Sequence, residues 1–290
     1  MAQASTTRGL RRAIAKEIRQ LDDAVDGIQT AHVGPDELGA MGIHVERVAP
    51  DGIYEALQFE PCFFMPLAST TLTDYPVVVD EDERQISPLY DESSCYPDGE
   101  STVWEWDTME EARSTYHHVT SHVWAIQHDN SHSNENESKP LEDLTPWGQW
   151  TWKSHPSPQM ANFSAPGEWR SMDWLENNTH PHAIVTLIHD LSGNDTSLAR
   201  GEVKAVVWAL RYRYKLKEHK SHAILPVLVL SYMGPKHGRI IQAHHDGQKL
   251  VVQCSPFIGL HEENSPEMSL FIRYELAIPV GLTTHSICVR

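Results

Sequence analysis

The start of the chain carries one apolar stripe. Its members are spaced by four or three residues: Leu10, Ile14, Ile18, Leu21, Val25 and Ile28. This spacing brings the side chains to one face of an α-helix. The pattern predicts an amphipathic helix that ends near Gly27 and packs on the body of the protein.

A second helix and two polar segments are predicted in the middle of the chain. Residues 108–127 carry Glu110 and Glu111 in their first turn, where acids suit the positive end of a helix dipole. Residues 129–143 are almost wholly polar and cannot bury enough surface to form a core. We therefore expect a surface loop there, and a further, acidic loop over residues 80–100.

Short apolar runs predict strands. Phe63-Phe64-Met65 and Val77-Val78-Val79 are two such runs in the first third of the chain. In the last third, residues 203–214 have helical spacing and lie between apolar runs that have strand character. The strands expected there are 183–188, 225–232, 239–243, 250–253 and 268–278.

This order of elements predicts an α+β fold, with a partly antiparallel sheet and packed amphipathic helices. A chain of 290 residues can form one large domain. We expect a single domain, 1–290, whose best-defined α+β core is residues 180–290, with the polar surface loop at about 129–143.

Composition narrows the class of protein. Hydrophobic residues make up 40% of the chain and charged residues 22%, as in globular proteins. The net charge of −17 repels DNA and anionic membranes at long range, so neither is an expected partner. The four cysteines are widely scattered, which favours free thiols and a cytoplasmic protein. A mitochondrial presequence over residues 1–16, which are basic, is the alternative.

One segment has the opposite charge. Residues 200–250 hold ten basic side chains and three acids, a local charge of 10 − 3 = +7, which leaves −17 − 7 = −24 for the rest. A basic helix on an acidic protein suits contacts with nucleic-acid phosphates. It could equally pair with acids of its own chain. The candidate RNA-binding residues are Arg211, Arg213, Lys215 and Lys217.

Asp190, Glu202 and Lys204 follow a pattern found in Mg²⁺-dependent nucleases of the restriction-enzyme-like fold. In such enzymes the two acids bind the metal and the lysine lies near the attacking water. The pattern requires Glu202 and Lys204 on one face of a strand, whereas the apolar spacing of residues 203–210 indicates a helix.

Two other clusters have chemical potential. His118 and His122 are four residues apart on a predicted helix, a spacing that suits a metal, although no Glu follows His118 and surface or core histidines are commoner. Asp22, Asp23 and Asp26 could hold Mg²⁺ or bind a guanidinium, or could be the solvated end of a helix. We expect no metal and no cofactor.

Residues 224–243, two apolar strands around the turn Gly234-Pro235, follow Arg200-Gly201-Glu202 and a basic helix. This pattern, within about 200–255, resembles a family of uncharacterised proteins from filamentous fungi. Some of these are arginine-containing cyclodipeptide synthases, which take aminoacyl groups from tRNA. That group is associated with an Asp-Asp-x-x-Glu motif, whereas the nearest segment here, residues 22–26, ends in Asp.

The resemblance implies an enzyme of specialised metabolism with aminoacyl-tRNA as its partner. Acyl transfer and cyclisation would give an arginine-containing cyclodipeptide as a small-molecule product. Glu202, or an acid of the Asp22–Asp26 cluster, would bind the arginine guanidinium or act as the base. The alternatives are the nuclease and a non-enzymatic RNA-binding or interaction module.

Overall fold

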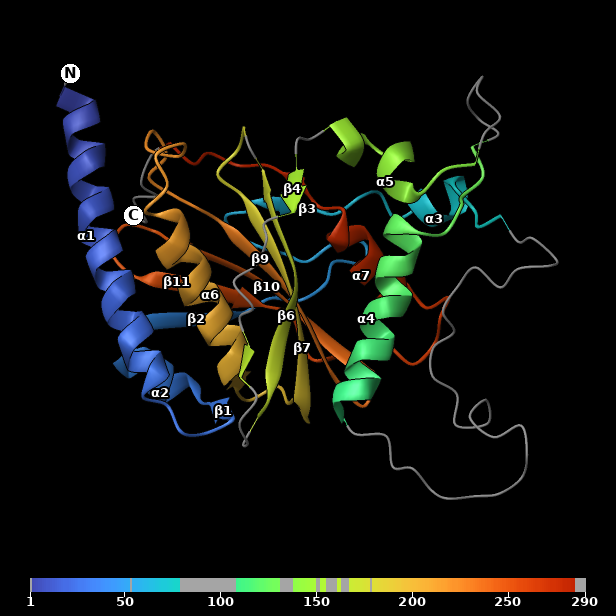
Figure 1. The fold of residues 1–290 in the computed structure, drawn as a ribbon, viewed down its shortest axis with the longest axis horizontal. Coiled ribbons are helices and arrows are strands. Elements are labelled where there is room, and N and C mark those ends of the chain that lie inside the picture. The colour runs from blue at the N-terminus through green and yellow to red at the C-terminus, as the bar shows by residue number, and fades with distance from the viewer. Residues whose placement is uncertain are drawn as a thin grey trace.

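The computed structural model of the chain describes residues 2–52, 54–78, 108–130, 138–149, 152–154, 161–162, 167–177 and 179–284. A mixed β-sheet lies at its centre, in the order β2-β11-β10-β9-β7-β6-β4 (Figure 1). Short strands β12 and β5 pair with β10 and β6. The bounds are β2 (Ile43–Arg47), β4 (Trp152–Ser154), β5 (Ala161–Asn162), β6 (Trp169–Asn177), β7 (Ala183–Ser192), β9 (Val227–Gly234), β10 (His237–His245), β11 (Leu250–Cys254) and β12 (Ile258–Gly259).

Most neighbouring strands are antiparallel, but β7 with β9 and β11 with β2 are parallel. Two parallel strands need a crossover between them. Here the chain leaves β7, forms α6 (Arg200–Arg213) and returns as β9. The crossover therefore places the basic helix against the middle of the sheet.

Helices cover both faces of the sheet. α1 (Ala2–Asp26) and α6 lie side by side on one face, and α4 (Thr108–Trp124) and α7 (Pro266–Glu275) lie on the other (Figure 1). In β9, Val227 and Val229 belong to the core under α1 and α6, while Leu228 and Leu230 belong to the core under α4 and α7. Since successive strand residues point to opposite faces, a strand buried on both faces is apolar throughout.

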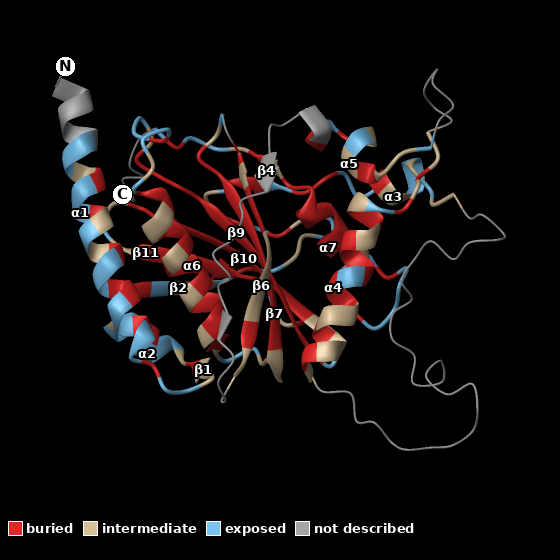
Figure 2. Ribbon diagram, viewed as in Figure 1, coloured by how far each residue is buried: buried red, intermediate tan, exposed pale blue. Residues whose placement is uncertain are grey.

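Burial follows these layers. The sheet is buried along most of its length, whereas the outer face of α1 is exposed (Figure 2). None of the helices in the described residues is both long enough and apolar enough to cross a membrane. The smaller elements are β1 (His32–Val33), α2 (Pro35–Ala40), β3 (Phe64–Met65), α3 (Thr71–Asp74), α5 (Leu141–Leu144), η2 (Pro146–Gln149), β8 (Leu198–Ala199) and β13 (Ile278–Pro279).

The α+β fold is confirmed, as are the predicted helices, which correspond to α1, α4 and α6. The sheet extends beyond residues 180–290, because β2, β4 and β6 precede that range. Residues 79–107 and 131–137, which include the expected acidic loop 80–100 and part of 129–143, lie outside the described residues. Within the described part, Val77 forms an isolated bridge with His128.

The predicted strand at 268–278 is wrong, because these residues form helix α7 and a short turn into β13. The residue before the helix is Ser265, whose Oγ accepts a hydrogen bond from the Met268 backbone N–H at 3.1 Å and so caps the helix. Pro266 takes the first helical position, where its missing N–H costs nothing. Ser-Pro-Glu before an apolar run is a start signal for a helix, and it outweighs the strand-like composition.

Replacing Ser265 by Ala removes this cap. We expect the free energy of unfolding to fall by about 1 kcal/mol, because the N–H of Met268 loses its partner. Urea denaturation of the full chain measures the change. Ser192→Ala, at an exposed strand end, is the matched control and should change stability little. Equal stability of the two variants would contradict the assigned cap.

Candidate functional site

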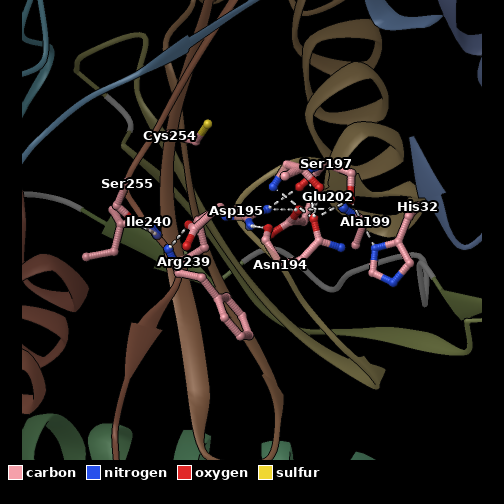
Figure 3. A network of polar contacts seen from close by, with 12 residues as sticks. His32, Asn194, Asp195, Ser197, Ala199, Glu202, Arg239, Ile240, Cys254 and Ser255 are labelled. Carbon is pink, nitrogen blue, oxygen red and sulfur yellow. Dashed lines mark hydrogen bonds and ion pairs between the residues drawn. The ribbon is translucent and has the colours of Figure 1, made fainter. Parts of the chain in front are cut away.

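Glu202, the leading catalytic candidate, is fully buried near the start of α6 (Figure 3). Its Oε2 accepts hydrogen bonds from the Ala199 backbone N–H at 2.7 Å and from Arg239 Nη1 at 3.0 Å. Arg239 lies on β10 and is buried as well. A carboxylate at a helix start is stabilised by the helix dipole, so Glu202 caps α6 and ties it to the sheet.

The same arginine fixes the loop between β7 and β8. Arg239 Nη1 donates to the Ser197 carbonyl at 3.1 Å, and Nη2 donates to the Asn194 carbonyl. The Asn194 side chain accepts from the backbone N–H groups of Thr196 and Ser197, at 2.9 Å each. Glu202 and Arg239 thus hold a loop in place rather than facing solvent (Figure 3).

His189 lies in the same buried region as Glu202 and Arg239. It is fully buried on β7, and burial lowers its pKa to about 4, so the ring is neutral near pH 7. A Cβ on Gly201 would lie 2.7 Å from the His189 ring and 2.6 Å from the Trp169 ring. A side chain at position 201 would therefore clash with both rings, and Glu202 itself has no exposed surface.

The three residues of the nuclease pattern contact different partners. Glu202 and Lys204 lie on helix α6, so the strand required by that pattern is absent from this part of the described chain. Asp190 Oδ1 accepts a hydrogen bond from Thr108 Oγ1, and Lys204 contacts acids of α1. The geometry that the nuclease hypothesis needs is thus not formed.

Asp22 joins α1 to α6. It is 1% exposed, and it accepts hydrogen bonds from Lys204 Nζ at 2.8 Å and from Arg211 Nη1. Lys204 also contacts Asp26 Oδ1 at 2.5 Å. Burial by itself would raise the pKa of Asp22, but the hydrogen bonds from the two cations hold it below its usual value. The Asp cluster thus binds a guanidinium, that of its own chain's Arg211.

Two further basic residues of this segment point inward. Arg213 is fully buried, donates to the Pro226 carbonyl at 2.9 Å and lies 3.4 Å from Glu176. Burial lowers its pKa to about 10. Arg200 donates to the Ile28 carbonyl at 2.8 Å. Arg213 therefore cannot bind RNA as the sequence suggested, and Arg211 is engaged by Asp22.

An exposed set of cations lies beside the contact between α1 and α6. Arg11 donates to the carbonyls of His222, at 2.6 Å, and Tyr214, at 3.3 Å, so the first half of α1 contacts the segment after α6. Other basic residues of α1 lie on the flank next to Arg11 and are exposed, as are three lysines of residues 215–220. We call this set the basic face: Arg8, Arg12, Lys16, Arg19, Lys215, Lys217 and Lys220.

The opposite face of the sheet holds two acids with altered ionisation. Tyr232 donates to Glu275 Oε1 at 3.1 Å, and Tyr116 donates to Asp173 Oδ2 at 2.7 Å. Burial, with a smaller effect of Asp173, raises the pKa of Glu275 to about 8. Burial also raises the pKa of Asp173. Raised carboxyl pKa values are typical of acid–base sites, but Glu275 is only 1% exposed and lies within the core.

The two acids, Glu275 and Asp173, were not predicted from the sequence. The available signal was an isolated acid in an apolar context, Glu275 within the apolar run 270–278 and Asp173 between two tryptophans. An acid in such a position is either paired or neutral when the chain folds. The partners Tyr116 and Tyr232 come from other elements, so spacing alone could not identify them.

His118 and His122 of α4 share one buried face, as their spacing predicts, whereas His117 is exposed. The ring centroids of His118 and His122 are 5.2 Å apart, and that of His128 lies 5.9 Å from His122. Burial lowers the pKa of His122 to about 3. Among the described residues, no three His, Cys, Asp or Glu side chains are arranged to hold a metal ion.

Replacing Glu202 by Ala leaves Arg239 buried without its carboxylate. We expect the free energy of unfolding to fall by roughly 3–5 kcal/mol. In the double variant Glu202→Leu with Arg239→Met the free energy of unfolding should fall by less than this, because no unpaired charge stays in the interior. Chemical denaturation of both variants measures the difference, and a double variant less stable than Glu202→Ala would contradict the assignment.

The Glu275 pKa gives a prediction for pH. Its folded-state pKa of about 8 lies above the ordinary 4.5, so the folded chain keeps a proton that the unfolded chain releases. The stabilisation is complete below pH 4.5 and is lost as the pH rises through 8. Glu275→Gln keeps an acceptor for Tyr232 and does not titrate. Denaturation between pH 5 and 8 should show a decline in stability for the unchanged chain and a flatter profile for Glu275→Gln; parallel profiles would refute this.

Comparison of the chain with protein-family models, with curated proteins and with solved structures gives no match. The resemblance of residues 200–255 to the fungal cyclodipeptide synthases therefore stays a prediction. Among the described residues, the basic face is exposed to solvent.

Proposed function

We propose that the protein binds the phosphate backbone of an RNA through the basic face. The observation that carries the proposal is a division among the cations. Arg211, Arg213 and Arg239 are engaged by acids of the chain, while the seven cations of the basic face have no ion pair in the described part of the molecule. Exposed cations without acidic partners are free to replace the counterions of phosphates.

The spacing on α1 suits a phosphate backbone. Arg8, Arg12, Lys16 and Arg19 follow one another at intervals of four, four and three residues, which keeps them on one flank of the helix. At a rise of about 1.5 Å per residue, the row is about 16 Å long. The lysines of residues 215–220 widen the row where Arg11 contacts that segment.

The size of the basic face favours RNA over long duplex DNA. A net charge of −17 surrounds a short positive row, so a duplex that extends past the row meets repulsion. A folded or single-stranded RNA can place a few phosphates on the row, and because its backbone bends, the rest of it can avoid the acidic surface. Of the RNA-binding residues predicted from the sequence, Lys215 and Lys217 support this proposal.

Aminoacyl-tRNA is the RNA that the resemblance implies, and acyl transfer would be a further step. Glu202 and Asp22 are buried in ion pairs and Asp26 contacts Lys204, so of the proposed carboxylates Asp23 is the exposed one without an ion pair among the described residues. Mass spectrometry of arginine diketopiperazines from an expressing bacterium tests that step separately from RNA binding.

The double variant Lys16→Glu with Lys215→Glu tests the docking. We expect weaker binding of unfractionated tRNA, and a slope of log K against log salt that is less steep by about 1.5, because two phosphate contacts are lost. Fluorescence anisotropy over a series of salt concentrations measures both quantities, and a thermal melt verifies folding.

The double variant Arg113→Glu with Arg170→Glu is the matched control. Both arginines already contact acids, Glu110 and Glu168, and they lie outside the basic face. The control should bind tRNA much as the unchanged chain does. Undiminished binding by Lys16→Glu with Lys215→Glu would refute the proposal, and equal affinity for a long DNA duplex would refute the preference for RNA.

A further inference from the structure

Two histidine rings meet where β10 pairs with β12. His237, the first residue of β10, lies directly opposite Gly259 of β12. The pairing continues past β12, because the Leu260 backbone N–H donates to the Lys236 carbonyl at 2.7 Å. Side chains two positions apart in an extended segment lie on the same face, which places His261 beside His237. Their ring centroids are 4.8 Å apart.

Gly259 leaves the space in which the two rings approach each other. A Cβ at this position would lie 3.2 Å from His261 Nε2 and 3.8 Å from His237 Nε2. The same nitrogen of each ring therefore lies within 4 Å of one point beside the strand. Imidazole nitrogens that converge on one point are the donors from which many metal sites are built.

The ring of His237 is held in the form that binds metal. Its Nδ1 donates to the Pro235 carbonyl, since a carbonyl oxygen can only accept. A neutral His237 therefore carries its proton on Nδ1 and presents the lone pair of Nε2. A histidine that ligates a metal almost always donates its other N–H in this way. The ring of Phe257 stacks on that of His237, with centroids 4.6 Å apart and an interplanar angle of 6°, and fixes its orientation.

An ion can reach both rings from solvent. His261 is exposed and His237 is partly exposed. Burial lowers the pKa of His261, with smaller effects of His237 and Lys236 in the same direction and of Glu262 in the opposite direction. His261 is therefore neutral near pH 7, and a neutral imidazole is the form that ligates metal. Because His261 is exposed, its ring has room to adjust to the distance of roughly 2.1 Å that zinc requires.

We propose that His237 and His261 bind a divalent transition-metal ion such as Zn²⁺ through their Nε2 atoms. Imidazole suits Zn²⁺, Ni²⁺ and Cu²⁺, whereas Mg²⁺ and Ca²⁺ prefer oxygen ligands. Since the described residues contain no group of three His, Cys, Asp or Glu that could hold a metal, water fills the remaining positions. The sequence analysis expected no metal, because the two histidines are distant along the chain. Neither belongs to the basic face, so the test of this site does not depend on RNA binding.

Isothermal titration of the full, chelator-treated chain with ZnCl₂ tests the site. The double variant His237→Gln with His261→Gln should bind one zinc ion fewer per chain than the unchanged protein. Either single variant should weaken that site by at least about tenfold, because a lost ligand costs no less than a lost outer-shell partner. His44→Gln with His117→Gln, at exposed positions of β2 and α4, is the matched control and should retain the ion. Equal zinc binding by the unchanged chain and by His237→Gln with His261→Gln would overturn the proposal.

Chemical modification locates the ion without a variant. With zinc bound, His237 and His261 should react more slowly with diethyl pyrocarbonate than they do in the metal-free chain, whereas the rate at His117 should not change. Peptide mass spectrometry measures the three rates. Unchanged modification of His237 and His261 at saturating zinc would contradict the site, and this result decides the proposal even where the double variant does not fold.

Discussion

The distribution of charge in this protein depends on one buried carboxylate. Asp22 on α1 binds both Lys204 and Arg211 of α6, and Lys204 also reaches Asp26. An unpaired carboxylate in this position would be strongly destabilising, so the two helices are held together by charge as well as by their apolar faces. This contact neutralises two cations of α6, whereas Arg8, Arg12, Lys16 and Arg19 of α1 are exposed and have no ion pair among the described residues.

Buried ion pairs recur through the molecule in the same structural role. Glu202 with Arg239, and Glu176 with Arg213, each join elements that are distant in sequence. Pairs of this kind contribute little net stability compared with apolar packing, but breaking one is costly. They therefore account for charged groups in the interior of the described residues.

The sequence predicted the elements whose patterns are local. The apolar stripe of α1 and the spacing of α6 follow from helical periodicity, and strand β9 follows from a nearly continuous apolar run. Helix α7 was mistaken for a strand because its apolar residues are nearly continuous, although Ser265-Pro266-Glu267 marks a helix start. Local order does not reveal which charges meet: Asp22 and Arg211 are 189 positions apart, and Glu275 lies 43 positions from Tyr232.

The most direct test of this division of cations is lysine acetylation of the full chain, with and without tRNA, followed by mass spectrometry. Lys204 should react slowly in both cases, because it is held by Asp22 and Asp26. Lys16, Lys215, Lys217 and Lys220 should react readily in the free protein and be protected when tRNA is bound. Fast modification of Lys204, or tRNA that protects none of the other four, would contradict the assignment.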